Sequence, residues 1–163
     1  MLNQPIIEEL KRESSSTKRM LERIPEDKFD WKPHEKSKSL GQLASHVADL
    51  PGFLNSILTR DEVDFKKGDY KTSQVKTPEG LMQVFQENLD EVLQTLQNTS
   101  DEKMQANFTL RRGDHVIATV PRIAAARSMA LSHIIHHRGQ LSVYLRLLHI
   151  PVPGMYGPSA DEI

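Results

Sequence analysis

Three of the seven histidines lie close together in the segment SHIIHHRGQLSVYLRLL, which runs from Ser132 to Leu148. If this segment is a helix, His133 and His137 lie one turn apart and project side by side, whereas His136 is turned about 100° away from His137. A pair of histidines at this spacing suits a shared metal ion. The spacing therefore marks His133 and His137 as candidate metal ligands and leaves His136 outside the pair.

His46 is the third candidate ligand, on a different predicted helix. Leu43, Leu50 and Leu54 define the inward face of that helix, and His46 borders this face. Inward-facing imidazoles need partners for both ring nitrogens, and one metal ion would serve all three histidines. Two alternatives stay open: ordinary core histidines, or a metal-free helical dimer whose buried histidines hydrogen-bond to one another.

Polar residues on neighbouring turns are candidates to support such a site. Gln140 follows His137 by one turn, where it would orient a ligand or bind substrate, unless it is simply exposed. Asp49 follows His46 by one turn and could accept an imidazole N–H, although a solvated carboxylate is the simpler interpretation. Arg138 points away from the histidine face, which indicates an ion pair at a surface or dimer contact.

Four segments have the apolar spacing of amphipathic helices, and these would position the candidate residues. They cover approximately residues 3–23, 39–59, 77–98 and 122–148. Their predicted N-terminal caps are Asn3, Thr77 and Ser39, the last in a capping box with Gln42.

Residues 101–121 differ from the helical segments. Polar and apolar residues alternate there around an Arg-Gly-Asp sequence, which predicts a short hairpin before the last helix. Together these elements predict an all-α protein. Its fold would be a four-helix bundle with long connections, formed by a single domain over residues 1–163.

The composition excludes several classes of function. The sequence has 21 basic and 22 acidic residues and a formal net charge of -1, without the basic surplus of a nucleic-acid-binding protein. It contains no cysteine, which excludes disulfides, thiolate ligands and a cysteine nucleophile. We find neither a signal-peptide pattern nor an apolar run near the ~18 residues of a membrane span. We therefore expect a cytoplasmic protein with no nucleic-acid or membrane partner.

Several longer motifs resemble the DinB-like (DinB/YfiT) superfamily of damage-inducible bacterial proteins. They are LGQLASHVADL around His46, SHIIHHRGQLSVYLRLL around His133 and His137, and the closing IPVPGMYGPSADE. The connection RIPEDKFDWKPHEKSKSLGQL is similar as well, so the resemblance spans most of the chain. Residues 60–121 contribute little to it.

The resemblance implies a four-helix bundle, commonly a homodimer, that holds a divalent metal through His46, His133 and His137. Zinc or nickel is the expected metal. Three protein ligands leave a position open for water or a small thiol, as in catalytic sites. Relatives include thiol-dependent transferases and metal-dependent hydrolases, so we expect a metal-dependent enzyme acting on small molecules, with a low-molecular-weight thiol as a candidate partner. A non-catalytic metal-binding stress-response module is the alternative.

Overall fold

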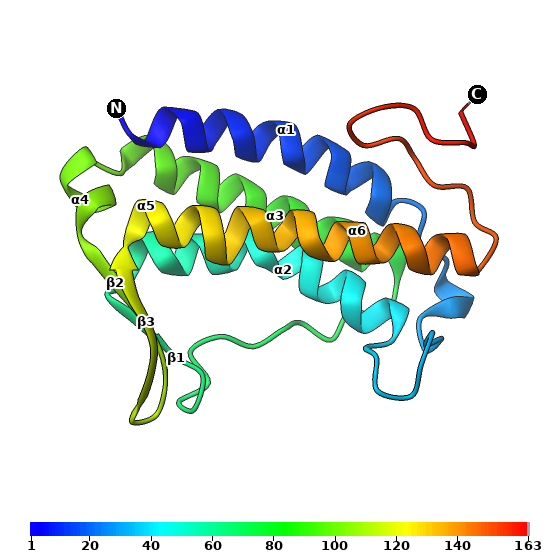
Figure 1. Ribbon diagram of the computed structural model, residues 1–163, viewed down its shortest axis with the longest axis horizontal. Coiled ribbons are helices and arrows are strands. Elements are labelled where there is room, and N and C mark those ends of the chain that lie inside the picture. Colours follow the sequence, from blue (N-terminus) through cyan, green and yellow to red (C-terminus); the bar gives the residue numbers. More distant parts are fainter. Residues whose placement is uncertain (163) are drawn as a thin grey trace.

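Four long helices pack side by side in the computed structural model, which describes residues 1–162 (Figure 1). They are α1 (Asn3–Leu21), α2 (Leu40–Thr59), α3 (Pro78–Asn98) and α6 (Ser132–Leu147). Short helices lie in the connections: η1 (Glu26–Lys28), α4 (Asp101–Gln105) and α5 (Arg122–Ala125). The predicted four-helix bundle is therefore present. Within the described part of the chain, no helix combines the length and the apolar character needed to cross a bilayer.

A small sheet at one end of the bundle corrects the prediction that the protein is all-α. It has three strands in the order β1 (Glu62–Asp64), β2 (Asn107–Arg112) and β3 (His115–Pro121). The antiparallel pairing of β2 with β3 confirms the predicted hairpin. The strand β1, which pairs with β2 in parallel, was missed because three residues are too few to show the alternation that reveals a strand.

The helix ends agree with the sequence at two of the three predicted caps. Ser39 Oγ accepts a hydrogen bond from the Gln42 N–H at 3.2 Å and Gln42 Oε1 accepts one from the Ser39 N–H at 2.9 Å, which is the predicted capping box. Thr77 caps α3 through its side-chain oxygen, which accepts a hydrogen bond from the Gly80 N–H at 3.1 Å. The prediction for Asn3 was wrong. Asn3 is the first residue of α1, and its side-chain amide donates to the Leu96 carbonyl at 2.7 Å, which ties α1 to the end of α3.

The last predicted helix is not uniform. Residues Ala126–Leu131 form a π-helical segment, named η2, between α5 and α6. A π-turn holds about one residue more than an α-turn. The side chains of α6 therefore point in a different direction from the one that a continuous α-helix would give them. Both histidines of the predicted pair lie after this segment, within α6, and their one-turn spacing is therefore unaffected.

A buried ion pair joins α6 to α1. Arg138 is only 2% exposed, and its Nη2 donates to Glu13 Oε2 at 2.7 Å. Tyr156, in the C-terminal tail, donates its hydroxyl hydrogen to the same carboxylate at 2.7 Å. Burial raises the pKa of Glu13, but the hydrogen bonds from Tyr156 and Arg138 outweigh it and hold that pKa below its usual range. The expectation that Arg138 pairs at a surface or dimer contact is corrected, because its partner lies inside the bundle.

Removal of this guanidinium should destabilise the bundle strongly. Arg138→Met leaves the buried Glu13 carboxylate with only the largely exposed Arg12, 3.5 Å away, as a cationic neighbour, so we expect a loss of about 3–5 kcal/mol in the free energy of unfolding. Urea denaturation followed by circular dichroism measures it. The double variant with Glu13→Gln, which also removes the charge, should recover much of the loss. If Arg138→Met lowers the free energy of unfolding by less than about 1 kcal/mol, the ion pair does not contribute strongly to the stability of the bundle.

Candidate metal centre

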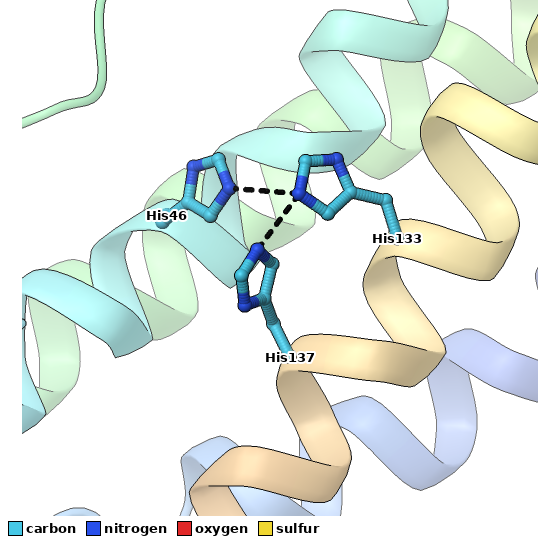
Figure 2. A group of neighbouring side chains, drawn as sticks. All are labelled: His46, His133 and His137. Atoms are coloured by element: carbon cyan, nitrogen blue, oxygen red, sulfur yellow. Dashed lines mark hydrogen bonds between the residues drawn. The ribbon is translucent and has the colours of Figure 1, made fainter.

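Three histidine side chains converge between α2 and α6 (Figure 2). His46 comes from α2, and His133 and His137 come from successive turns of α6. The Nε2 atom of His133 lies 3.4 Å from Nε2 of His46 and 2.7 Å from Nε2 of His137. One ligand atom from each residue lies within 4.8 Å of the other two. The structure thus brings together the three residues that the sequence marks as candidate ligands.

Close packing of α2 against α6 produces this convergence. Ala44, Val47 and Ala48 on α2 are fully buried in one apolar cluster with Leu141 and Leu145 of α6. Two of the three α2 side chains are alanines, which lets the helices approach closely. The histidines lie at the edge of this contact and are partly buried.

The hydrogen bonds of the two α6 histidines fix their tautomers. His133 Nδ1 lies 3.2 Å from the carbonyl oxygen of Met129, and His137 Nδ1 lies 2.7 Å from Gln140 Oε1. Carbonyl oxygens only accept hydrogen bonds, so His133 Nδ1 carries the hydrogen and donates it, and His137 Nδ1 does the same with the Gln140 amide in this orientation. In the neutral rings, both Nε2 atoms therefore present lone pairs.

These lone pairs point at each other across 2.7 Å. With neither Nε2 able to donate, the contact is repulsive unless a proton or another cation lies between the rings. The alternative in which neutral histidines hydrogen-bond to one another would require an N–H on one of the facing Nε2 atoms. A cation shared by His46, His133 and His137 would turn the same contact into an attraction.

The donor set fits a divalent transition metal. Zinc binds imidazole nitrogen at about 2.0–2.1 Å, which separates nitrogens at neighbouring tetrahedral vertices by about 3.4 Å. The His46–His133 separation of 3.4 Å matches this value, whereas the His133–His137 separation of 2.7 Å is shorter. Neutral imidazoles also suit nickel, copper and iron. Within residues 1–162, the buried Nδ1 of His46 has no hydrogen-bond partner, so its tautomer is not fixed as the other two are.

Burial keeps the three rings neutral near pH 7. It lowers the pKa of His46 to about 4, with further contributions from the charges of His137, His133 and Lys38. Burial is also the largest cause of the lowered pKa values of His133 and His137. Because a metal binds the unprotonated nitrogen, protons compete little for these ligand atoms at neutral pH.

The other candidate residues near the site lie in different environments. Gln140 is exposed, as the simpler alternative expected, and its Oε1 lies 2.7 Å from His137 Nδ1. Asp49 is buried, and its Oδ2 accepts from the backbone N–H and the hydroxyl of Ser73 at 2.6 and 3.0 Å. It is therefore neither solvated nor bonded to an imidazole. Burial raises the pKa of Asp49, and the Ser73 hydrogen bonds lower it by less. His136 is exposed and is not part of the cluster.

Two features near the site were not found from the sequence. The Met129 carbonyl that orients His133 is a backbone atom, so no residue type could signal it. Lys38 precedes α2, and its charge reaches both His46 and His137. The capping residue Ser39 marked the start of α2, yet nothing in the linear sequence placed Lys38 beside α6.

Solved structures share this fold. A DinB-like protein from Bacillus cereus is 22% identical, with a TM-score of 0.70 over 93% of this chain and 95% of its own. A DinB family member from Exiguobacterium sibiricum is 18% identical, with a TM-score of 0.70 over 99% and 97%. YfiT from Bacillus subtilis, described as a probable metal-dependent hydrolase with an unusual four-helix bundle topology, is 18% identical, with a TM-score of 0.64 over 90% and 87%.

The comparison of sequences with a family model agrees with these structures. Among curated proteins, no sequence matches this chain. The model of the DinB family, however, matches residues 1–163. That match and the motifs around the three histidines give the same assignment: the chain belongs to the DinB family.

Proposed function

We propose that the protein binds a divalent metal through His46, His133 and His137 and is a metal-dependent enzyme acting on small molecules. The observation that supports this most directly is the convergence of the three side chains, which brings one ligand atom of each histidine within 4.8 Å of the other two. Burial, which keeps the rings neutral, supports the same assignment. Zinc or nickel is the proposed metal.

The number of ligands favours a catalytic over a structural site. Within residues 1–162, the cluster contains three candidate ligand residues, whereas structural zinc sites usually have four protein ligands. A metal held by three imidazoles would supply a Lewis acid with an open position, able to lower the pKa of a bound water or thiol. The role of the protein is to offer three neutral nitrogens and to hold their rings through Gln140 and the Met129 carbonyl.

Two reaction types are in keeping with this site. Thiol transfer, with a low-molecular-weight thiol as partner, is the first, and hydrolysis is the second. Hydrolysis gains support from the description of YfiT as a probable metal-dependent hydrolase, a protein that shares the fold and the family. We further propose that the protein forms a homodimer, as the resemblance implies.

The metal assignment predicts one bound ion that depends on all three histidines. The purified protein, reconstituted with zinc or nickel and then dialysed, should retain about one equivalent by elemental analysis. His46→Ala, His133→Ala and His137→Ala should each retain less than about a tenth of an equivalent, because two imidazoles hold an ion weakly. His136→Ala is the matched control and should bind as the unaltered protein does. Metal retention by all three variants would defeat the proposal.

The contact between Gln140 and His137 predicts a weaker but measurable effect. Gln140→Ala removes the acceptor that fixes the His137 tautomer, and loss of such a partner typically costs 10–100-fold in metal affinity. Competition with a chromogenic chelator measures the dissociation constant. Gln140→Glu keeps an acceptor oxygen and should stay within about threefold of the unaltered affinity. If the Ala and Glu variants bind metal equally, Gln140 does not orient the ligand.

A paired assay separates the two chemistries. For thiol transfer, the thiol sulfur bonds to carbon of chlorodinitrobenzene, chloride leaves and the thiol proton is released. We expect the metal-loaded protein to accelerate this conjugation, and metal-free protein and His137→Ala not to. Metal-dependent hydrolysis of nitrophenyl acetate without any thiol would instead favour a hydrolase. Absence of both activities in metal-loaded protein would favour a non-catalytic metal-binding module.

A further inference from the structure

A glycine that packs against nothing in the protomer lies in the middle of α6. Gly139 is helical and exposed, and a methyl group added to its Cα would meet no atom of the rest of the described chain within 4 Å. By contrast, the two glycines of α2, Gly41 and Gly52, lie so close to other side chains that such a methyl group would collide with them. Glycine in a helix interior is less favourable than alanine, and packing within the protomer does not account for it at this position.

Two large apolar side chains are exposed beyond Gly139 on the same face of α6. Val143, one turn further along, is 56% exposed, and Leu147, two turns further along, is 54% exposed. A largely apolar groove of about 320 Å³ lies beside them, lined by Ser142, Val143, Arg146, Leu147 and Val152. The face therefore presents an open space at the glycine and then two protruding side chains.

The face carries no charged side chain, unlike the outward faces of two other long helices. Its exposed residues, which we call the outer stripe of α6, are Ser132, His136, Gly139, Val143 and Leu147. The charged residues exposed on α1 include Glu8, Lys11, Arg12 and Lys18, and those on α3 include Glu79, Glu87, Asp90 and Glu91. Because charged residues are depleted at the centres of protein interfaces, the outer stripe is the long-helix face best suited to association.

The outer stripe is complementary to itself when two copies of α6 pack antiparallel. A twofold axis beside Leu141 places Val143 of each protomer over Gly139 of its partner, because both residues are two positions from Leu141. Each valine then fills the open space at a glycine, and the missing side chain lets the two helices approach closely. Parallel packing would instead set glycine against glycine and valine against valine, and would leave the space empty.

This pairing leaves the histidine cluster accessible. His136 belongs to the outer stripe and is turned about 100° from His137 around the helix. A second helix packed on the stripe therefore lies on the flank of α6 and does not cover the face that bears the candidate ligands.

We infer that the outer stripe of α6 is the interface with a second copy of this chain, packed antiparallel so that Val143 of each protomer lies on Gly139 of the other. The inference rests on the homodimer put forward with the proposed function and assigns its interface. The uncharged, self-complementary surface selects a second copy over a partner of different sequence, because the same two residues supply both halves of the contact.

A side chain added at Gly139 tests the interface without disturbing the protomer. Gly139→Gln fills the open space with a residue of higher helix propensity, so circular dichroism should show the helix content of the unaltered protein. Sedimentation equilibrium should give a dimer for the unaltered protein and a dissociation constant raised about tenfold or more in the variant, as for the loss of a central interface contact. Ser15→Gln is the matched control. It adds the same side chain to the exposed face of α1 and should not change the dissociation constant.

Introduced cysteines test the antiparallel register, because the sequence contains no cysteine. Gly139→Cys and Val143→Cys proteins are mixed and oxidised in air, and mass spectrometry identifies the linked pairs. Antiparallel packing should link one variant to the other, whereas parallel packing would link each variant to itself.

The outcomes separate the inference from the proposals on which it rests. A dimer that persists unweakened in Gly139→Gln, or cysteines that link only within one variant, would overturn the inference and leave the homodimer standing. A monomeric unaltered protein would overturn the inference and the homodimer together. Elemental analysis of the same samples reports on the metal site independently of either result.

Discussion

The arrangement of three imidazoles between two closely packed helices is the constraint on which the candidate site depends. Imidazoles can be buried only if their nitrogens find partners, and here two Nδ1 atoms are bonded to oxygens while their Nε2 atoms face each other. The two Nδ1 atoms thus point away from the cluster, and the two Nε2 atoms point into it. Such a cluster offers one ligand atom from each of three imidazoles to a common point, which is the arrangement that the proposed metal would need.

The sequence was sufficient for the parts of the fold that have a strong periodic or capping signal. The capping box at Ser39 and the Thr77-Pro78 start defined two helices to the residue, because each is a local interaction between neighbouring turns. The hairpin was visible as alternation. The strand β1 and the π-helical segment could not be predicted from the sequence. The strand depends on pairing with a distant segment, and the π-helical segment depends on how that turn packs against its neighbours.

The same distinction applies to the site. His133 and His137 could be paired from their spacing alone, because one helix sets their relation. Placing His46 with them required a contact between two helices that periodicity cannot supply, and family resemblance filled that gap. Asp49 was misjudged because its partner, Ser73, lies in a connection without a regular pattern. Arg138 was assigned to a surface or dimer contact because it points away from the histidine face, and its compensating carboxylate, Glu13, lies on α1, distant in sequence.

The π-helical segment η2 separates two structural requirements of the chain. The hairpin before it must pair with β1, whereas α6 after it must present a fixed face to α2. A continuous α-helix would couple the two, since rotating one end would rotate the other. The same segment contains Met129, whose carbonyl lies 3.2 Å from His133 Nδ1, so this wider turn and the packing of Leu141 and Leu145 together determine the direction of the imidazoles. An insertion or deletion that turned this segment into regular α-helix would therefore move the carbonyl that holds the His133 ring.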